Sequence, residues 1–213
     1  MSEKEKHIAS FSAVVMGASA GGFEAMTEIF SILPSGFRLP ILIVQHLHNT
    51  DNGRFAEHLS RISSLPVIEP CDKELVKEGC IYTAPANYHM SVERNFSISL
   101  SVDEKVNWSR PSIDVLFESA ARAWGRRLIA VILSGANFDG SKGMLTIKEF
   151  GGFLIAQDPE TAEQSAMPKS AIKLAGTETV LSPSEIGKYL MVLSSSNYTS
   201  TKWSKPGRAG DIQ

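Results

Sequence analysis

The chain has 213 residues, of which 43% are hydrophobic and 21% are charged. This balance suits one folded domain with a substantial core and is unlike that of a disordered chain. The formal net charge is -2 and neither sign forms a long run, which argues against a nucleic-acid groove or an anionic membrane surface as partner. We therefore expect a protein or a small molecule as partner.

The cysteines and the chain ends indicate which kinds of protein are not expected. Cys71 and Cys80 lack CxxC spacing and no histidine cluster accompanies them, so neither a disulfide framework nor a metal site is expected. No apolar signal segment or membrane-length run occurs, which predicts a cytoplasmic protein. We expect residues 1–10 to be a short charged head, residues 11–193 the folded domain and residues 194–213 a flexible tail.

Apolar runs alternate with segments of helical period along the chain. Strands are predicted over residues 11–16 and 40–44, and the apolar residues between them recur at helical spacing: Met26, Ile29, Phe30 and Leu33. The pattern strand, helix, strand implies a parallel pair.

The same alternation returns later in the chain. Strands are predicted over residues 128–133 and 152–156, after a helix marked by Ile113, Leu116, Phe117, Ala120 and Trp124. The strand runs are continuously hydrophobic, as expected of strands covered on both faces. The sequence thus predicts a doubly wound, mostly parallel α/β sheet in three layers, similar to a Rossmann fold.

Two further elements complete the prediction. Residues 89–92 and 96–100 read as the arms of an antiparallel β-hairpin attached to the parallel sheet. Ser182, Pro183 and Glu185 form a capping box with proline at the first helical position, which predicts a last helix.

Ser19 lies in the turn Gly-Ala-Ser-Ala-Gly-Gly of residues 17–22, between the first strand and its helix. A serine at such a turn presents its hydroxyl at the carboxyl edge of the sheet, beside free helix N–H groups, which suits a nucleophile. Gly21 and Gly22 permit close approach of helix and sheet, and the N–H of Ala20 points at the developing oxyanion. The same turn is equally suited to hold a phosphate, although both the GxGxxG and the Walker patterns are missed.

Histidine and aspartate candidates follow other strands. Loops at the carboxyl ends of parallel strands converge on one crevice, so an imidazole there is able to take the serine proton. His46 ends the second strand and is favoured, while His48 and His89 remain candidates. Asp139 and Asp158 both follow strands, and the residues alone do not choose between them as the supporting acid.

With these loops laid out, the chain resembles the catalytic domain of the CheB family of protein-glutamate methylesterases and glutamine deamidases. The resemblance spans roughly residues 12–190 and rests on a set of motifs in matching order: MGASAGG at 16–22, VQH at 44–46, IYTAP at 81–85 with His89, RPSIDVLF at 110–117, DG at 139–140 with Gly143, and IAQD at 155–158 followed by Met167-Pro168. Such a set is more specific than any one motif.

The resemblance implies a catalytic triad of Ser19, His46 and Asp139, and it leaves Asp158 a structural or rim role. In the family, the serine attacks the γ-carbonyl of a methylated glutamate on the cytoplasmic helices of a chemoreceptor. Methanol leaves, and water hydrolyses the acyl-enzyme. Neither a metal nor another cofactor is implied.

The chain departs from the family pattern beside the nucleophile. Ala20 replaces a threonine of Ser-Thr-Gly-Gly, and Ser134-Gly135-Ala136-Asn137 replaces Thr-Gly-Met-Gly. The oxyanion and substrate-adjacent positions implied by the resemblance are Ala20, Gly21, Ala136 and Asn137. We expect the departures to affect oxyanion geometry and substrate preference more than the triad.

Family members usually carry an N-terminal receiver domain, whereas about ten residues precede the first strand here. The expected alternatives are a constitutive enzyme, an excised domain, or an enzyme regulated by a separate receiver-type partner. A methylated receptor-like protein is the expected substrate. The alternative function is a non-catalytic signalling module of the same fold.

Overall fold

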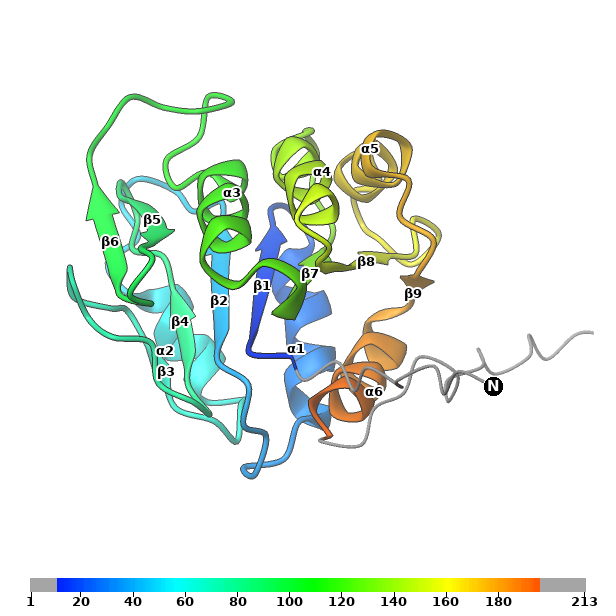
Figure 1. Ribbon diagram of the computed structural model, residues 1–213, viewed down its shortest axis with the longest axis horizontal. Coiled ribbons are helices and arrows are strands. Elements are labelled where there is room, and N and C mark those ends of the chain that lie inside the picture. The colour runs from blue at the N-terminus through cyan, green and yellow to red at the C-terminus, as the bar shows by residue number, and fades with distance from the viewer. Residues whose placement is uncertain (1–10, 196–213) are drawn as a thin grey trace, which may run out of the picture.

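The computed structural model describes residues 11–195 and forms a three-layer α/β domain (Figure 1). Seven strands make one parallel sheet in the order β3-β4-β2-β1-β7-β8-β9. They are β1 (Ala13–Ala18), β2 (Ile41–Gln45), β3 (Val67–Ile68), β4 (Ile81–Thr83), β7 (Leu128–Ile132), β8 (Phe153–Gln157) and β9 (Val180–Leu181). The predicted fold class is confirmed. The predictions of a charged head and of a flexible tail fall on residues that lie almost entirely outside the described part.

Helices cover both faces of the sheet. One face carries α1 (Gly22–Ile32), α2 (Arg54–Ser60) and α6 (Pro183–Ser194). The other carries α3 (Ile113–Trp124), the short 3-10 helix η1 (Gly125–Arg127), α4 (Ser141–Glu149) and α5 (Ala166–Ala175). In Figure 1, α3, α4 and α5 stand in a row above the sheet, with α1 and α6 on its far side. The predicted capping box of α6 forms between Ser182 and Glu185.

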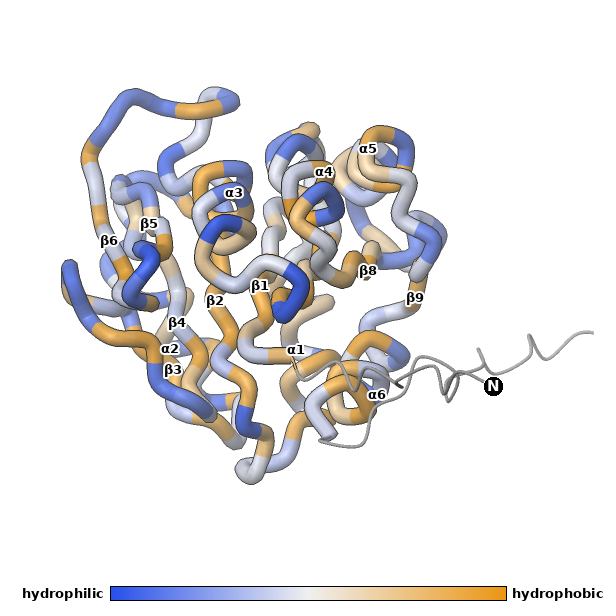
Figure 2. Tube along the Cα trace, in the orientation of Figure 1, coloured by the Kyte–Doolittle hydropathy of each residue, from blue (hydrophilic) through white to orange (hydrophobic). Residues whose placement is uncertain are grey.

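Each central strand contributes to two hydrophobic cores. All residues of β1 are buried, with Val14 and Met16 in the core under α1 and α6, and Ala13 and Val15 in the core under α3 and α4. Figure 2 shows these strands as hydrophobic, in contrast to the hydrophilic loop that follows β6. Burial on both faces explains why the sequence of these strands is continuously apolar and does not alternate.

The antiparallel hairpin forms as predicted, from β5 (His89–Val92) and β6 (Ile98–Ser101). It is a separate two-stranded sheet beside the parallel sheet. Both edges of β4 are already paired, one with β3 and one with β2. The hairpin therefore has no free edge of β4 to join, and it packs its buried side chains against α3.

The strand order brings three loops together. From β1 the chain moves to β2 on one side, and β7 later returns to pair with β1 on the other side. Such a reversal of strand order is where open parallel sheets hold their ligands, at the carboxyl ends of the strands. The loops after β1, β2 and β7 consequently frame one candidate site.

Candidate active site

Ser19 and His46 occupy equivalent positions at the ends of neighbouring strands. Ala18 of β1 pairs with Gln45 of β2, and the N–H of His46 donates to the carbonyl of Ala18 over 3.0 Å. On the other side, the N–H of Ser19 donates to the carbonyl of Ser134 over 2.9 Å. Neighbouring strands lie about 4.8 Å apart, so the parallel register sets Ser19 beside both the His46 loop and the loop after β7.

The turn after Ser19 depends on glycine. Gly21 precedes α1 with φ at 74°, in the left-handed region. A Cβ atom on Gly21 would lie 2.5 Å from Cβ of Glu163 and 2.6 Å from Oγ of Ser134. Glycine alone satisfies both the backbone angle and the contact, so the sequence predicted this turn correctly.

His46 and Asp139 form a direct pair across the site. Nε2 of His46 lies 2.8 Å from Oδ2 of Asp139, and their side chains are 13% and 0% exposed. Because Asp139 occupies Nε2, Nδ1 is the imidazole nitrogen left to accept a proton. Nδ2 of Asn137 lies 3.5 Å from that Nδ1, at the outer limit of a hydrogen bond.

The carboxylate of Asp139 also caps α3. It accepts the N–H of Ile113 over 2.7 Å, that of Asp114 over 3.3 Å, and the hydroxyl of Ser112 over 2.9 Å. The first N–H groups of a helix lack partners within the helix and carry its positive dipole end. Asp139 is therefore held as an anion by the helix that it caps.

Asn107 joins Asp139 to a second buried carboxylate. Its Nδ2 donates to Oδ1 of Asp139 and to Oδ2 of Asp114, both over 2.7 Å. Asp114 also accepts the N–H of Gly143 over 2.7 Å. One amide nitrogen thus bridges the two acids and holds both in place.

These contacts set the acid strengths in opposite directions. Burial by itself would raise the pKa of Asp139, but hydrogen bonds from His46, Asn107 and the N–H of Ile113 outweigh burial and lower that pKa below its usual value. Burial raises the pKa of Asp114, the charge of Asp139 adds to the rise, and the hydrogen bonds that Asp114 accepts only partly oppose it. The carboxyl that contacts the imidazole is thus the one kept charged.

Gln45 holds the backbone at both Ser19 and His46. Its Nε2 donates to the carbonyl of Ser19 over 2.8 Å and to that of His46 over 3.2 Å. Among residues 11–195, no hydrogen-bond partner is found for the hydroxyl of Ser19 or for the N–H groups of Ala20 and Ala136. A free hydroxyl and free N–H groups therefore occur together at this edge of the sheet.

Ser134, which replaces a threonine of the family pattern, retains a hydroxyl that makes hydrogen bonds. Its Oγ donates to the carbonyl of Ala20 over 2.7 Å and accepts the N–H of Gln164 over 2.9 Å, so a hydroxyl at this position joins two loops. Serine keeps the hydroxyl that threonine would supply. Asn137 stands where the family pattern has a glycine, and its own φ is not positive. Its Oδ1 accepts the N–H of Asp139 over 3.1 Å.

The other candidate residues have different surroundings. His89 is buried, its Nδ1 accepts the N–H of Ser112 over 3.2 Å, and its Nε2 lies 3.0 Å from the carbonyl of Glu104, so both nitrogens are used in support of a loop. His48 contacts Thr50. Asp158 caps its own turn through the N–H of Glu160. Of the three candidate histidines, only His46 contacts a carboxylate within the described residues.

Sequence reasoning missed the supporting residues Asn107, Ser112, Asp114 and Gln45. The motifs containing Gln45, Ser112 and Asp114 carried the resemblance, yet their spacing gives no role to the individual side chains. Asn107 lies just before the motif at 110–117, in a loop without helix or strand periodicity. Asn107 has a left-handed φ of 50°. Asparagine tolerates this conformation better than most residues, so its residue type was the one local signal in the sequence.

In the part of the chain that the structure describes, no group of three or more His, Cys, Asp and Glu side chains is arranged to hold a metal ion. No helix between residues 11 and 195 combines the length and apolar character needed to cross a bilayer.

A parallel α/β sheet with a serine turn and a buried carboxylate–imidazole pair at its carboxyl edge is an arrangement typical of the hydrolase class. A family model described as CheB methylesterase matches residues 14–190. The chain belongs to the CheB methylesterase family, whose members are carboxylic-ester hydrolases.

Individual relatives agree. The chain is 44% identical over 188 residues to a putative protein-glutamate methylesterase/protein-glutamine glutaminase of Leptospira interrogans, covering 88% of this chain and 97% of that protein. It is 38% identical to protein-glutamate methylesterase/protein-glutamine glutaminase 2 of Pseudomonas aeruginosa, covering 84% of this chain but 52% of that protein. The crystal structure of the Thermotoga maritima CheB methylesterase catalytic domain matches with a TM-score of 0.81 and 36% identity, covering 85% of this chain and 98% of that one.

Proposed function

We propose that this protein hydrolyses γ-methyl esters of glutamate side chains on a receptor-like signalling protein, and that it deamidates glutamine at equivalent positions. The observation that carries the proposal is the buried pair of His46 and Asp139, in register beside Ser19 at the edge of the sheet. The relatives from Leptospira interrogans and Pseudomonas aeruginosa are named for the same two activities, which supports the proposal.

The proposed reaction uses Ser19 as nucleophile. Its Oγ attacks the γ-carbonyl carbon while Nδ1 of His46 takes the hydroxyl proton, and the imidazolium is stabilised by Asp139 at Nε2. The tetrahedral intermediate collapses, the bond to the methoxy oxygen breaks, and the imidazolium gives its proton to that oxygen to release methanol. Water, deprotonated by His46, then hydrolyses the acyl-serine to free glutamate and Ser19.

Backbone N–H groups supply the oxyanion site in this proposal. Those of Ala20 and Ala136 have no acceptor within residues 11–195 and border Ser19 from two loops. Gly21 shapes the first loop and Asn137 the second, where the Asn137 side chain also faces His46. An oxyanion donor of this kind contributes about 10²- to 10³-fold to kcat.

The proposal extends to partner and location. The substrate is a methylated receptor-like protein in the cytoplasm, without nucleic acid or membrane insertion, and no cofactor takes part. The catalytic unit is residues 11–193. The proposal includes regulation by a separate receiver-type partner.

Methanol release from a methylated chemoreceptor fraction tests the function. Ser19→Ala should lower the rate by a factor on the order of 10⁴ or more, since no hydroxyl remains to form the acyl-enzyme. Ser31→Ala is the matched control, because the Ser31 hydroxyl is exposed and contacts only a carbonyl of its own helix. Equal rates for Ser19→Ala and the wild type would refute catalysis by Ser19, and a wild-type rate no higher than that of buffer alone would favour a non-catalytic binding module.

A further inference from the structure

A pocket of about 280 Å³ borders the imidazole of His46. It is lined by the loop after β2, by Asn87 and by residues 105–111 of the loop between β6 and α3. The lining side chains include two histidines, one lysine and one arginine, and none is acidic. The pocket is therefore cationic in character and is open beside the proposed general base.

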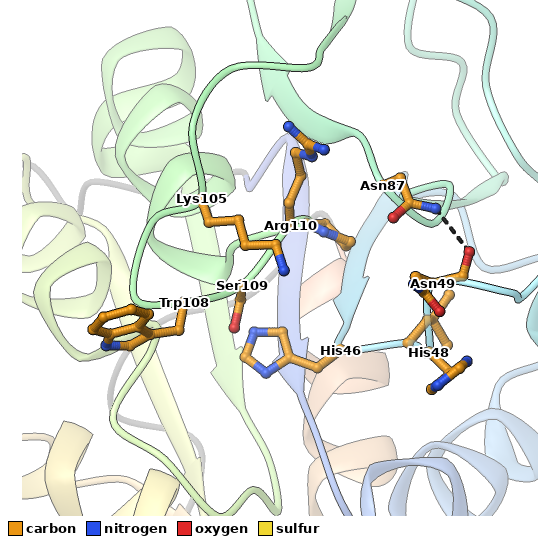
Figure 3. A pocket seen from close by; sticks show the side chains of 10 residues that line it. His46, His48, Asn49, Asn87, Lys105, Trp108, Ser109 and Arg110 are labelled. Carbon is orange, nitrogen blue, oxygen red and sulfur yellow. Dashed lines mark hydrogen bonds between the residues drawn. The ribbon is translucent and has the colours of Figure 1, made fainter.

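Lys105 supplies an unpaired charge to this pocket. In Figure 3 its side chain extends toward His46 and Ser109, with the ammonium group at the end that faces them. The ammonium group has no ion pair or hydrogen bond to any residue in the range 11–195. A lysine whose charge no described carboxylate neutralises is available to an anion that enters.

Arg110 adds a second charge from the opposite end of the pocket. One of its terminal nitrogens donates to the carbonyls of Val102 and Asp103 over 2.6 and 2.8 Å, which fixes the side chain. Its Nε is buried without any partner, and no described carboxylate pairs with the guanidinium. Two cations that no described carboxylate neutralises line one small space, so the pocket attracts an anion.

The chemistry of the neighbouring site indicates which anion fits. The proposed substrate presents glutamate side chains, and on a helix the residues three and four positions from the reacting ester lie on the same face. A carboxylate at one of those positions would reach the pocket while the ester faces Ser19. Trp108 lines the pocket and is 90% exposed, so it offers an apolar surface to the side chains of the substrate helix.

We propose that this pocket is a subsite for a second, unesterified glutamate on the substrate helix, and that Lys105 is the residue that selects it. The proposal rests on the function proposed above and specifies its substrate class: methyl esters with an acidic neighbour about one helical turn away. The pocket has no part in bond breaking. It positions the ester, because Lys105 pairs with the carboxylate of the neighbouring glutamate.

Two helical peptides test the subsite. Both carry one glutamate γ-methyl ester; one has glutamate at the positions three and four residues before and after it, and the other has glutamine there. For the wild type we expect kcat/KM for methanol release to be about fivefold higher on the acidic peptide, the upper range for a solvent-accessible ion pair. The difference should lie mainly in KM and shrink with added salt.

Substitutions that change the charge at position 105 test whether Lys105 causes the preference for the acidic peptide. Lys105→Gln should reduce the acidic-to-neutral ratio to about one, and Lys105→Glu should invert it, with preference restored by a peptide that carries lysine at the same positions. Lys188→Gln is the control, because Lys188 is exposed on α6 on the other face of the sheet and should leave the ratio at its wild-type value.

The outcomes separate the two proposals. Wild-type hydrolysis of both peptides at equal rates, or a ratio unchanged by Lys105→Glu, would overturn the subsite and leave the esterase function standing. Absence of methanol release from either peptide and from the methylated receptor fraction would instead refute the function on which the subsite depends.

Discussion

At the scale of single residues, Asp139 joins two tasks that sequence analysis treats separately. One oxygen contacts the imidazole of His46 and the N–H of Ile113, and the other accepts Ser112 and Asn107. A carboxylate with this many donors is held in one orientation as well as in its charged form. The imidazole that it contacts is consequently fixed with Nδ1 directed away from Asp139, at 3.5 Å from Nδ2 of Asn137.

Removing the Asn107 amide should weaken the proposed catalysis without unfolding the chain. Glycine adopts the φ of 50° at position 107 at no cost, so Asn107→Gly removes only the donor that bridges Asp139 and Asp114. A hydrogen bond to a charged group contributes about 1.5–3 kcal/mol, so we expect kcat to fall by roughly tenfold or more. KM should change little, and the acid limb of the kcat profile should move to higher pH as the pKa of Asp139 rises.

Asn107→Asp is the companion variant. It keeps the size and the backbone preference of asparagine but places a third carboxylate beside two others, so the loss at neutral pH should exceed that of Asn107→Gly. Steady-state kinetics from pH 3 to 9 measure both variants. An unshifted pH profile in Asn107→Gly would mean that the amide serves the fold alone.

At the scale of elements, the site depends on how closely α3 approaches the sheet. Gly17 of β1 and Gly140 before α4 both face Ile113, the first residue of α3. A Cβ on Gly17 would lie 2.4 Å from Cγ2 of Ile113. The N–H of Ile113 reaches Asp139 only because these two positions lack side chains.

Gly17→Ala should therefore damage stability and activity together. The added methyl group must displace the first turn of α3, at a cost of about 1–3 kcal/mol, and with it the carboxylate that orients His46. A shift of this size is expected to lower kcat by at least roughly tenfold. Thermal unfolding and methanol release measure the two effects.

Gly36→Ala is the control, because no atom lies within 4 Å of a Cβ at this exposed glycine and its φ is not positive. It should leave both quantities near the wild-type values. If Gly17→Ala lowers stability but leaves kcat unchanged, the position of α3 does not govern the catalytic carboxylate.

At the scale of the whole molecule, the acid stability of the fold reflects its two buried carboxyls. The pKa of Asp139 is lowered in the folded chain, so its contribution to stability is present well above 3.8 and is lost as the pH falls through 3.8 and then through the folded pKa. The pKa of Asp114 is raised, so its charge costs stability above its folded pKa and that cost disappears on acidification. The two effects oppose each other in the wild type.

Asp139→Asn should separate them. The variant should be less stable than the wild type at pH 6.5, because the cap of α3 and the partner of His46 lose their charge. It should then lose less stability than the wild type between pH 6.5 and pH 3, where Asp139 no longer titrates. Urea unfolding at both pH values gives the comparison, and an equal loss in the two proteins would show that Asp139 does not govern acid unfolding.

Local chemistry was sufficient to predict much of this protein. Continuous apolar runs predicted buried parallel strands, the glycines around Ser19 predicted the turn, and the box at Ser182 predicted the start of α6, because each signal lies within a few consecutive residues. The local pattern also predicted the hairpin, but not which elements it packs against, since the pairing of both edges of β4 depends on strands far away in the sequence.

The remaining decisions needed the tertiary structure. Spacing alone could not choose between Asp139 and Asp158, while the fold brings Asp139 to within 2.8 Å of His46, 93 residues away, and leaves Asp158 to cap its own turn. It likewise gave Asn107 its role between two acids. The sequence by itself determined the central strands, the hairpin and the turn at Ser19, because these follow from local periodicity and backbone preference. The tertiary structure alone decided which side chains meet, because strand order sets distances that no local pattern contains.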